Sequence, residues 1–174
     1  MSRLAISRAL AAVVAVLALG GSVAVLGPTS DGHAQALITG GARANFGVFG
    51  LRGGFMPDPA MYPVLSGGNI PAASLGLAPN CRGYVTAQPD VILHYSGPAR
   101  WVRFFFRGAG DTTLVINDGA GRWWCDDDSG GNLNPMIDMP NPVGGQYDIW
   151  VGSYRGGENI QGQLGVTEIP SMRP

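Results

Sequence analysis

The stretch from Asp111 to Tyr154 constrains the fold more than any other part of the chain, because short apolar runs alternate in it with turn residues. Asn117-Asp118-Gly119 is a strong hairpin signal, and residues 147–154 alternate apolar and other side chains with the period of two that a strand requires. This spacing is typical of hairpin-linked strands. We therefore predict an all-β protein, a jelly-roll-like β-sandwich of about seven to nine strands.

Further strands are predicted on both sides of this stretch. Residues 91–95 form an apolar run that Ser-Gly-Pro ends. Residues 101–107 alternate, with Val102, Phe104 and Phe106 on one face and Arg103, Phe105 and Arg107 on the other, which predicts a half-buried strand. In the next predicted strand, Thr112, Leu114 and Ile116 share one face. Leu164 and Val166 indicate a last strand, and Phe46 to Phe49 a first one. Residues 37–80 are loop-rich, and their part from Pro57 to Pro79 is either a disordered linker or a segment that packs through its apolar residues.

Composition narrows the class of protein. Among 174 residues there are 28 glycines and 13 prolines, and charged residues make up 13%, about half the usual share. The length predicts one domain. The net charge is −1, all 11 basic residues are arginine, and no basic stripe is present, so nothing indicates a nucleic-acid partner.

The amino terminus has the pattern of a signal peptide. Arg3 and Arg8 precede an apolar run over residues 9–26, and Ala34-Gln35-Ala36 matches the small-x-small cleavage site. We predict a signal peptide over 1–36, cleaved after Ala36, and a single exported domain over 37–174, periplasmic or secreted. The alternative is an uncleaved anchor, since the run is about long enough to span a bilayer; no other stretch is long and apolar enough to do so.

Cys81 and Cys125 are the only cysteines. In an oxidising compartment an isolated pair predicts a disulfide, which would stabilise the fold by on the order of 4 kcal/mol in the chain-entropy description. The alternative of free thiols or a metal pair lacks a supporting His or Cys at ligand spacing.

The acidic loop Asp126 to Gly131 allows a peptidase interpretation. Asp128-Ser129-Gly130-Gly131 is similar to the nucleophile motif of trypsin-like serine peptidases, with Asp127 in place of the leading glycine. That resemblance makes Ser129 the nucleophile and His94, the one histidine after the signal peptide, its base. His94 lies in a strand-like run without the family's sequence around it. The serine peptidase therefore remains the alternative hypothesis, and the preferred hypothesis has no catalytic residue.

The same loop allows a cation site. Three adjacent aspartates repel one another unless a cation neutralises them, and carboxylate and amide oxygens are the ligands that Ca²⁺ prefers. The expected ligands are Asp126, Asp127, Asp128, Asn132, Asn134 and Asp138, with Asp111 or Asp118 as additions from a neighbouring turn. The alternative is a solvated acidic turn.

Aromatic side chains on alternating strands suggest a binding face. If Trp123 points into the core, Trp124 does not, and exposed aromatics stack on sugars or bind extended peptides. The expected binding residues are Trp124, Trp150 and Tyr154, with the alternative that they fill the core. Nearby arginines, such as Arg103 and Arg122, are expected to stack on these rings or to pair with aspartates.

From Asp111 onward the chain resembles the bacterial pre-peptidase C-terminal domain family, which consists of small β-sandwiches on secreted peptidases. The matching positions are Asp111, Leu114, Asp118, Gly121, residues 127–131, and Gly145-Gln146-Tyr147 with Ile149 and Val151. The resemblance implies an exported, non-catalytic accessory module, in some members calcium-binding. We expect this module to contact a protein or glycan partner through the aromatic sheet face or the acidic loop. The resemblance covers roughly the last third of the chain.

Overall fold

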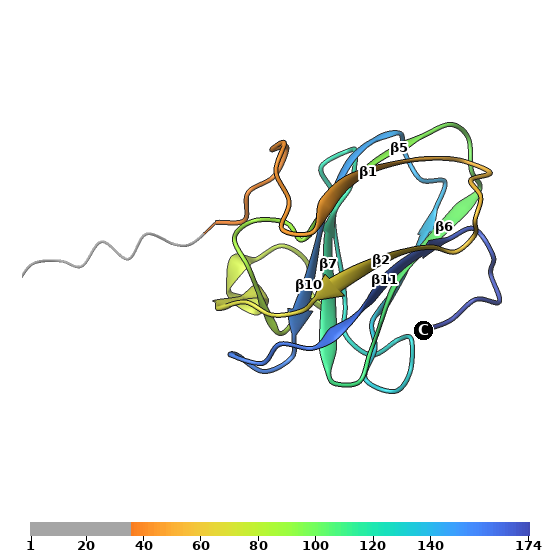
Figure 1. The fold of residues 1–174 in the computed structure, drawn as a ribbon. Helices are drawn as coiled ribbons and strands as arrows, with labels where there is room; N and C mark the ends of the chain where they lie inside the picture. The colour runs from red at the N-terminus through yellow and green to blue at the C-terminus, as the bar shows by residue number, and fades with distance from the viewer. Residues whose placement is uncertain (1–35) are drawn as a thin grey trace, which may run out of the picture. The chain divides into compact units, whose positions relative to one another are not determined.

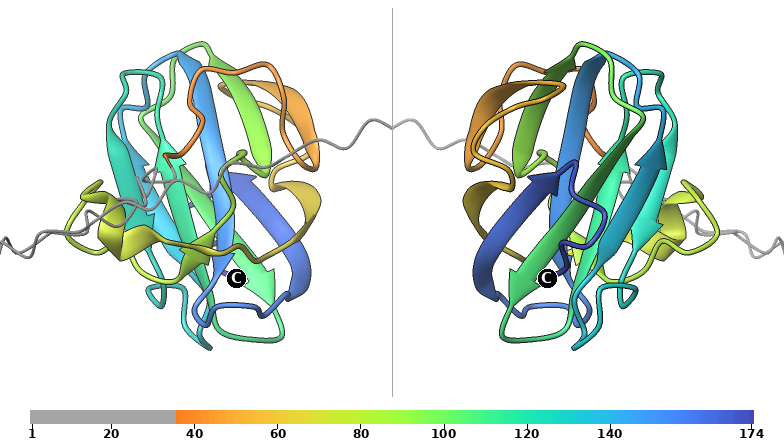
Figure 2. Two further views of the ribbon diagram at one scale, coloured as in Figure 1. Left: turned by 90° about the vertical axis from the view of Figure 1, so that its left-hand side faces the viewer. Right: turned by 90° about the vertical axis from the view of Figure 1, so that its right-hand side faces the viewer.

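The computed structural model describes residues 36–174, which form two β-sheets packed face to face (Figures 1 and 2). The first sheet contains β1 (Gly47–Arg52), β5 (Val91–Ser96), β10 (Gly145–Ser153), β7 (Thr112–Asn117), β8 (Trp123–Asp126) and two short strands, β3 (Ile70–Pro71) and β4 (Tyr84–Val85). The second sheet has the order β2 (Ala60–Leu65), β11 (Gln161–Thr167), β6 (Trp101–Gly108) and β9 (Met136–Pro140). A 3₁₀ turn, η1, spans Ala72–Leu75.

The strand pairing is that of a jelly roll. Four antiparallel pairs are nested along the chain: β2 with β11, β5 with β10, β6 with β9, and β7 with β8. β1 adds a parallel strand at the edge of β5. The predicted all-β jelly-roll sandwich with one disulfide is confirmed; the described residues contain eleven strands, of which β3 and β4 have only two residues each.

The main core lies between the two sheets. The inward residues of β6 are Val102, Phe104 and Phe106, as their alternation predicts, and all three are fully buried. From the first sheet, β7 contributes Leu114 and Ile116 to the same core. The period of two therefore identified the buried face of both strands.

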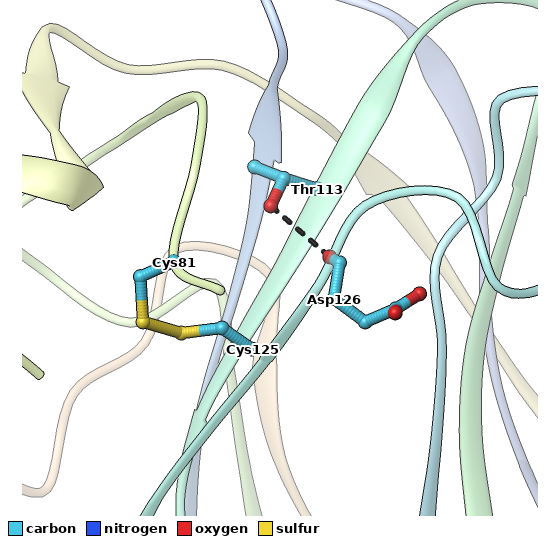
Figure 3. Close-up of a disulfide and its surroundings, with 4 residues drawn as sticks. All are labelled: Cys81, Thr113, Cys125 and Asp126. Carbon is cyan, nitrogen blue, oxygen red and sulfur yellow. Dashed lines mark hydrogen bonds between the residues drawn. A yellow bond between two sulfur atoms is a disulfide. The ribbon is translucent and has the colours of Figure 1, made fainter. Parts of the chain in front are cut away.

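A second apolar cluster covers the outer face of the first sheet. Trp150 of β10 and Val115 of β7 point away from the main core, and the segment 70–85 packs over them. The disulfide between Cys81 and Cys125 joins this segment to β8, with Cα atoms 4.9 Å apart (Figure 3). The predicted disulfide is confirmed, and residues 57–79 pack on the domain, so the disordered-linker alternative is wrong.

The sequence predicts that β6 is half-buried, with one face exposed to solvent. In the structure, the outer face of β6 is buried as well. Phe105 is fully buried and Arg103 is 5% exposed, although both point away from the core. The chain after β11 crosses this face, where Arg103 Nη1 donates to the carbonyl oxygens of Pro170 and Met172. Gly165 lies opposite Phe105 and leaves space for its ring.

The sequence did not predict β2 or β9. Each is an edge strand of the second sheet and pairs on one side only. β2 contains Pro63 and β9 ends at Pro140. Proline has no N–H group to donate to the hydrogen bonds between strands, so its presence weakens the sequence signal for a strand. An edge strand tolerates proline because one of its sides is unpaired, and β2 and β9 therefore form.

The predicted signal peptide lies outside the described residues except for Ala36. Within residues 36–174, the structure contains no helix with the length and apolar character needed to cross a bilayer.

We expect Gly165→Ala to lower the free energy of unfolding by about 1–3 kcal/mol, the usual cost of overpacking. A Cβ atom at Gly165 would lie 2.1 Å from the Phe105 ring. Gly50→Ala is the matched control, because its Cβ would meet no atom closer than 4.0 Å. Chemical denaturation of both variants checks this, and equal stabilities would contradict the packing described for Phe105.

Candidate functional site

Asp126 is a structural residue of the acidic loop. Its Oδ1 accepts a hydrogen bond from the Ser129 hydroxyl at 2.5 Å, and its Oδ2 accepts from the backbone N–H groups of Ser129 and Met136 at 3.0 and 2.8 Å. Thr113 Oγ1 donates to the Asp126 carbonyl at 3.1 Å (Figure 3). The Asp126 carboxylate therefore ties the loop to itself and to β9, and the Asp126 carbonyl ties it to β7.

Two more of the expected calcium ligands also have internal partners. Asn134 is 5% exposed; its Oδ1 accepts from the Gly108 N–H at 2.9 Å, and its Nδ2 donates to the Asn132 carbonyl at 3.1 Å. Asp138 forms a two-pronged ion pair with Arg103, with N–O distances of 2.6 and 2.8 Å. In residues 36–174 no three His, Cys, Asp or Glu side chains are grouped as metal ligands.

Asp111, Asp127 and Asp128 form the remaining negative cluster, called the acidic end below. Burial raises the pKa of Asp127, and repulsion from Asp128 and Asp126 raises it further. Burial also raises the pKa of Asp111, with added repulsion from Asp128 and Asp127. The structure thus brings Asp111 to the loop, as the sequence suggested.

Asp118 belongs to a different environment. Burial alone would raise its pKa, but hydrogen bonds from Trp124 Nε1 and from backbone N–H groups hold the pKa below its ordinary value. Arg122 pairs with the same carboxylate at 2.8 Å and stacks 5.4 Å from the Trp124 ring centroid. Asp118 therefore closes the β7–β8 hairpin and is separate from the acidic end.

Ser129 and His94 do not meet in this structure. His94 lies opposite Gln146 on β10, whereas the loop that carries Ser129 follows β8, at the other end of the sheet and three strands away. Strand spacing and rise place the two side chains about 20 Å apart. The Ser129 hydroxyl donates to Asp126 instead.

The three expected binding aromatics have three different environments. Trp150 is fully buried and packs 5.6 Å from the Trp123 ring, so the expectation that it is a surface binding residue is wrong. Its outward position on β10 is covered by the segment 70–85. Trp124 is half-buried against the main core. Tyr154 is 42% exposed.

Tyr154 lies in a shallow depression of about 250 Å³, called the Tyr154 surface below. Its lining residues are Pro71, Ala73, Arg82, Gly83, Tyr84 and Tyr154. Tyr84 belongs to β4, which pairs with β10 at Ser153, and the adjacent disulfide holds Arg82 in place. The Tyr154 N–H donates to the Asp111 carbonyl at 3.0 Å, so this surface adjoins the acidic end.

A buried carboxylate lines a second cavity. Asp90 is 2% exposed; Asn45 Nδ2 donates to its Oδ1 and the Val151 N–H to its Oδ2, each at 2.8 Å. Burial raises the pKa of Asp90 to about 7, against the lowering effect of these two hydrogen bonds. The cavity of about 200 Å³, called the Asp90 pocket below, is lined by Asn45, Phe46, Leu65, Ser66, Gly67, Gly68, Thr86, Asp90 and Asn159.

Sequence reasoning missed Arg82, Tyr84 and Asp90 as site residues. The first two follow Cys81, so the disulfide prediction already indicated a fixed segment there. Asp90 stands immediately before an apolar strand, where a charged residue is ordinarily exposed, so no local signal marks its burial. The disulfide prediction does not specify which distant residues complete the site.

No family model matches the chain, and neither the curated proteins nor the solved structures contain a match.

We expect the contribution of Asp90 to the stability of the protein to fall as the pH rises from about 4 to about 7, because its folded-state pKa lies above its ordinary value of 3.8. A raised carboxyl pKa favours folding while the group is protonated, and this contribution is lost as the pH rises through about 7. Asp90→Asn cannot ionise and should flatten the dependence, as measured by denaturation at several pH values.

Asn159→Ser is the control for this experiment, because Asn159 lines the same cavity and carries no titratable group. This variant should keep the pH dependence of the parent protein. An unchanged pH dependence in Asp90→Asn would contradict the assignment to Asp90.

Proposed function

We propose that residues 37–174 are an exported, non-catalytic binding module that contacts a glycan through the Tyr154 surface. The observation that carries this proposal is the exposed Tyr154 ring beside Tyr84 and Arg82, around one depression. Tyrosine rings offer apolar faces for the C–H face of a sugar, and each hydroxyl offers a hydrogen bond. Arg82 adds a planar group of donors for sugar oxygens.

The non-catalytic part of the proposal is supported by the placement of Ser129. Its hydroxyl is engaged by Asp126, and His94 lies on a distant part of the sheet. A serine nucleophile needs a base within hydrogen-bond reach. Ser129 and His94 thus lack the arrangement that the peptidase hypothesis requires.

Export is supported by two independent features. The amino-terminal pattern is that of a cleaved signal peptide. The disulfide between Cys81 and Cys125 is the kind of bond that persists in oxidising compartments. Together they support a periplasmic or secreted location.

The resemblance to pre-peptidase C-terminal domains supports the accessory role. A small β-sandwich is the architecture that the resemblance implies, and the acidic loop with Asp127 and Asp128 lies at the end of a hairpin. We propose that the module serves secreted enzymes or the cell envelope by attachment to glycan.

We expect Tyr154→Ala to weaken glycan binding about fivefold, because aromatic contacts contribute about 1 kcal/mol beyond their buried area. The measurement is calorimetric titration of the exported protein with a panel of soluble oligosaccharides. Phe46→Ala is the control, because Phe46 is similarly exposed, at 40%, and does not line the Tyr154 surface.

Three outcomes would contradict the proposal. Binding that survives Tyr154→Ala unchanged, or a protein partner captured where no glycan binds, would reject the glycan assignment. Labelling by a fluorophosphonate that disappears in Ser129→Ala would establish the serine-peptidase alternative.

Calcium binding at the acidic end remains a prediction. If Asp127 and Asp128 bind calcium, the ion will relieve their repulsion, and the protein will melt at a higher temperature in calcium than in EDTA. Asp128→Asn should remove this difference, whereas Asp148→Asn, whose carboxylate is held by Gly40 and Gln146, should keep it. Equal melting temperatures of the parent protein would identify the loop as a solvated acidic turn.

A further inference from the structure

The Asp90 pocket lies at a gap in the first sheet. β10 pairs with β5 as far as Ile149 and with β4 at Ser153. Between these points, the Val151 N–H donates to Asp90 Oδ2, and the Val151 carbonyl accepts from the Gly67 N–H at 3.1 Å. A side chain and a loop therefore replace the missing strand, and the cavity opens above them.

Among residues 36–174, no basic side chain forms an ion pair with Asp90. The ion pairs in the described part of the chain are Arg103 with Asp138, Arg122 with Asp118, and Arg155 with Glu158. A buried carboxylate without a cationic partner is costly, because its charge is removed from water. Asp148 is also buried and held by neutral donors, but Asp90 differs in lining a cavity.

The shape and walls of the cavity restrict what can occupy it. A volume of about 200 Å³ holds about six or seven waters, which is the size of one side chain and below that of a typical ligand pocket. Phe46 and Leu65, each 40% exposed, supply apolar walls. Asp90 supplies negative charge, and Asn159 and Thr86 supply polar atoms.

We propose that the Asp90 pocket binds a primary alkylammonium group, with the ammonium on the Asp90 carboxylate and the alkyl stem between Phe46 and Leu65. An ammonium needs one free lone pair on the carboxylate, and both oxygens retain one after the bonds from Asn45 and Val151. Phe46 can add a cation–π contact. This site goes beyond the glycan proposal and shares no lining residue with the Tyr154 surface.

Two rival cations suit the pocket less well. A guanidinium binds best as a wide planar fork on both carboxylate oxygens at once, whereas Asp90 is only 2% exposed and an ammonium needs access to one oxygen. A calcium ion prefers six to eight oxygen ligands at close range, and Asp90 is the one carboxylate among the residues that line the cavity.

The alkylammonium group must come from another molecule if it is a lysine, because the sequence contains none. A free amine and a lysine of an extended polypeptide carry the same chemistry. The pocket adjoins the start of β1, which among residues 36–174 pairs with β5 alone. An extended peptide can add to such an edge, so the peptide source predicts tighter binding than a free amine.

The test is an NMR titration of ¹⁵N-labelled exported protein with n-butylamine and with the neutral n-butanol. We expect saturable shifts of the Gly67, Gly68 and Val151 amide signals with n-butylamine alone. Asp90→Asn should weaken this binding about tenfold or more, as loss of a charged hydrogen bond does. Equal shifts with n-butanol, no shifts with n-butylamine, or unchanged affinity in Asp90→Asn would overturn the proposal.

A second pair of variants keeps the test valid if Asp90→Asn does not fold. Asn159 is exposed at the pocket, so Asn159→Trp should block the cavity without removing a hydrogen bond of Asp90. Asn80→Trp is the matched control at an exposed site outside the pocket. Binding of n-butylamine should be lost in the first variant and kept in the second; retention in both would overturn the proposal.

Two peptides distinguish the sources. A pentapeptide of alternating valine and threonine with a central lysine is compared with the same peptide carrying norleucine. Binding of the lysine peptide about tenfold or more tighter than n-butylamine identifies a polypeptide source, and equal affinity identifies a free amine. Stronger binding of the norleucine peptide would overturn the ammonium assignment.

Discussion

The covalent link between Cys81 and Cys125 fixes the segment that covers the outer face of the first sheet. It holds the segment 70–85 against β8, and the apolar cluster around Trp150 forms beneath that segment. Tyr84 and Arg82 then lie beside Tyr154, and β4 extends the sheet next to β10.

Buried charges are accommodated in two ways. Arg103 pairs with Asp138 and with carbonyl groups of the last residues, so the chain end covers the second sheet. Asp118 pairs with Arg122 at the hairpin. Asp90 instead receives only neutral donors beside an open cavity. A charge whose partner is missing inside the fold is a physical reason to look for a partner outside it.

Much of the fold followed from local pattern. The alternation of β6, β7 and β10, the turn at residues 117–119 and the disulfide pair all occur where they were predicted. β2 and β9 were missed because prolines at sheet edges weaken the strand signal. Phe105 and Trp150 were expected at a surface and are buried, since other segments of the chain cover both outer faces.

The amino-acid sequence by itself determined the all-β class, the inner faces of the central strands and the pairing of the two cysteines, because period, turn chemistry and cysteine count are local or countable properties. Only the tertiary structure decided which acidic and amide side chains already have partners within the fold. Asp126, Asn134 and Asp138 carry oxygen atoms of the kind that calcium prefers, yet their partners are distant backbone groups and Arg103. It also placed Asp90 beside Asn45 and Gly67, since residues far apart in sequence meet only after the sheets have packed.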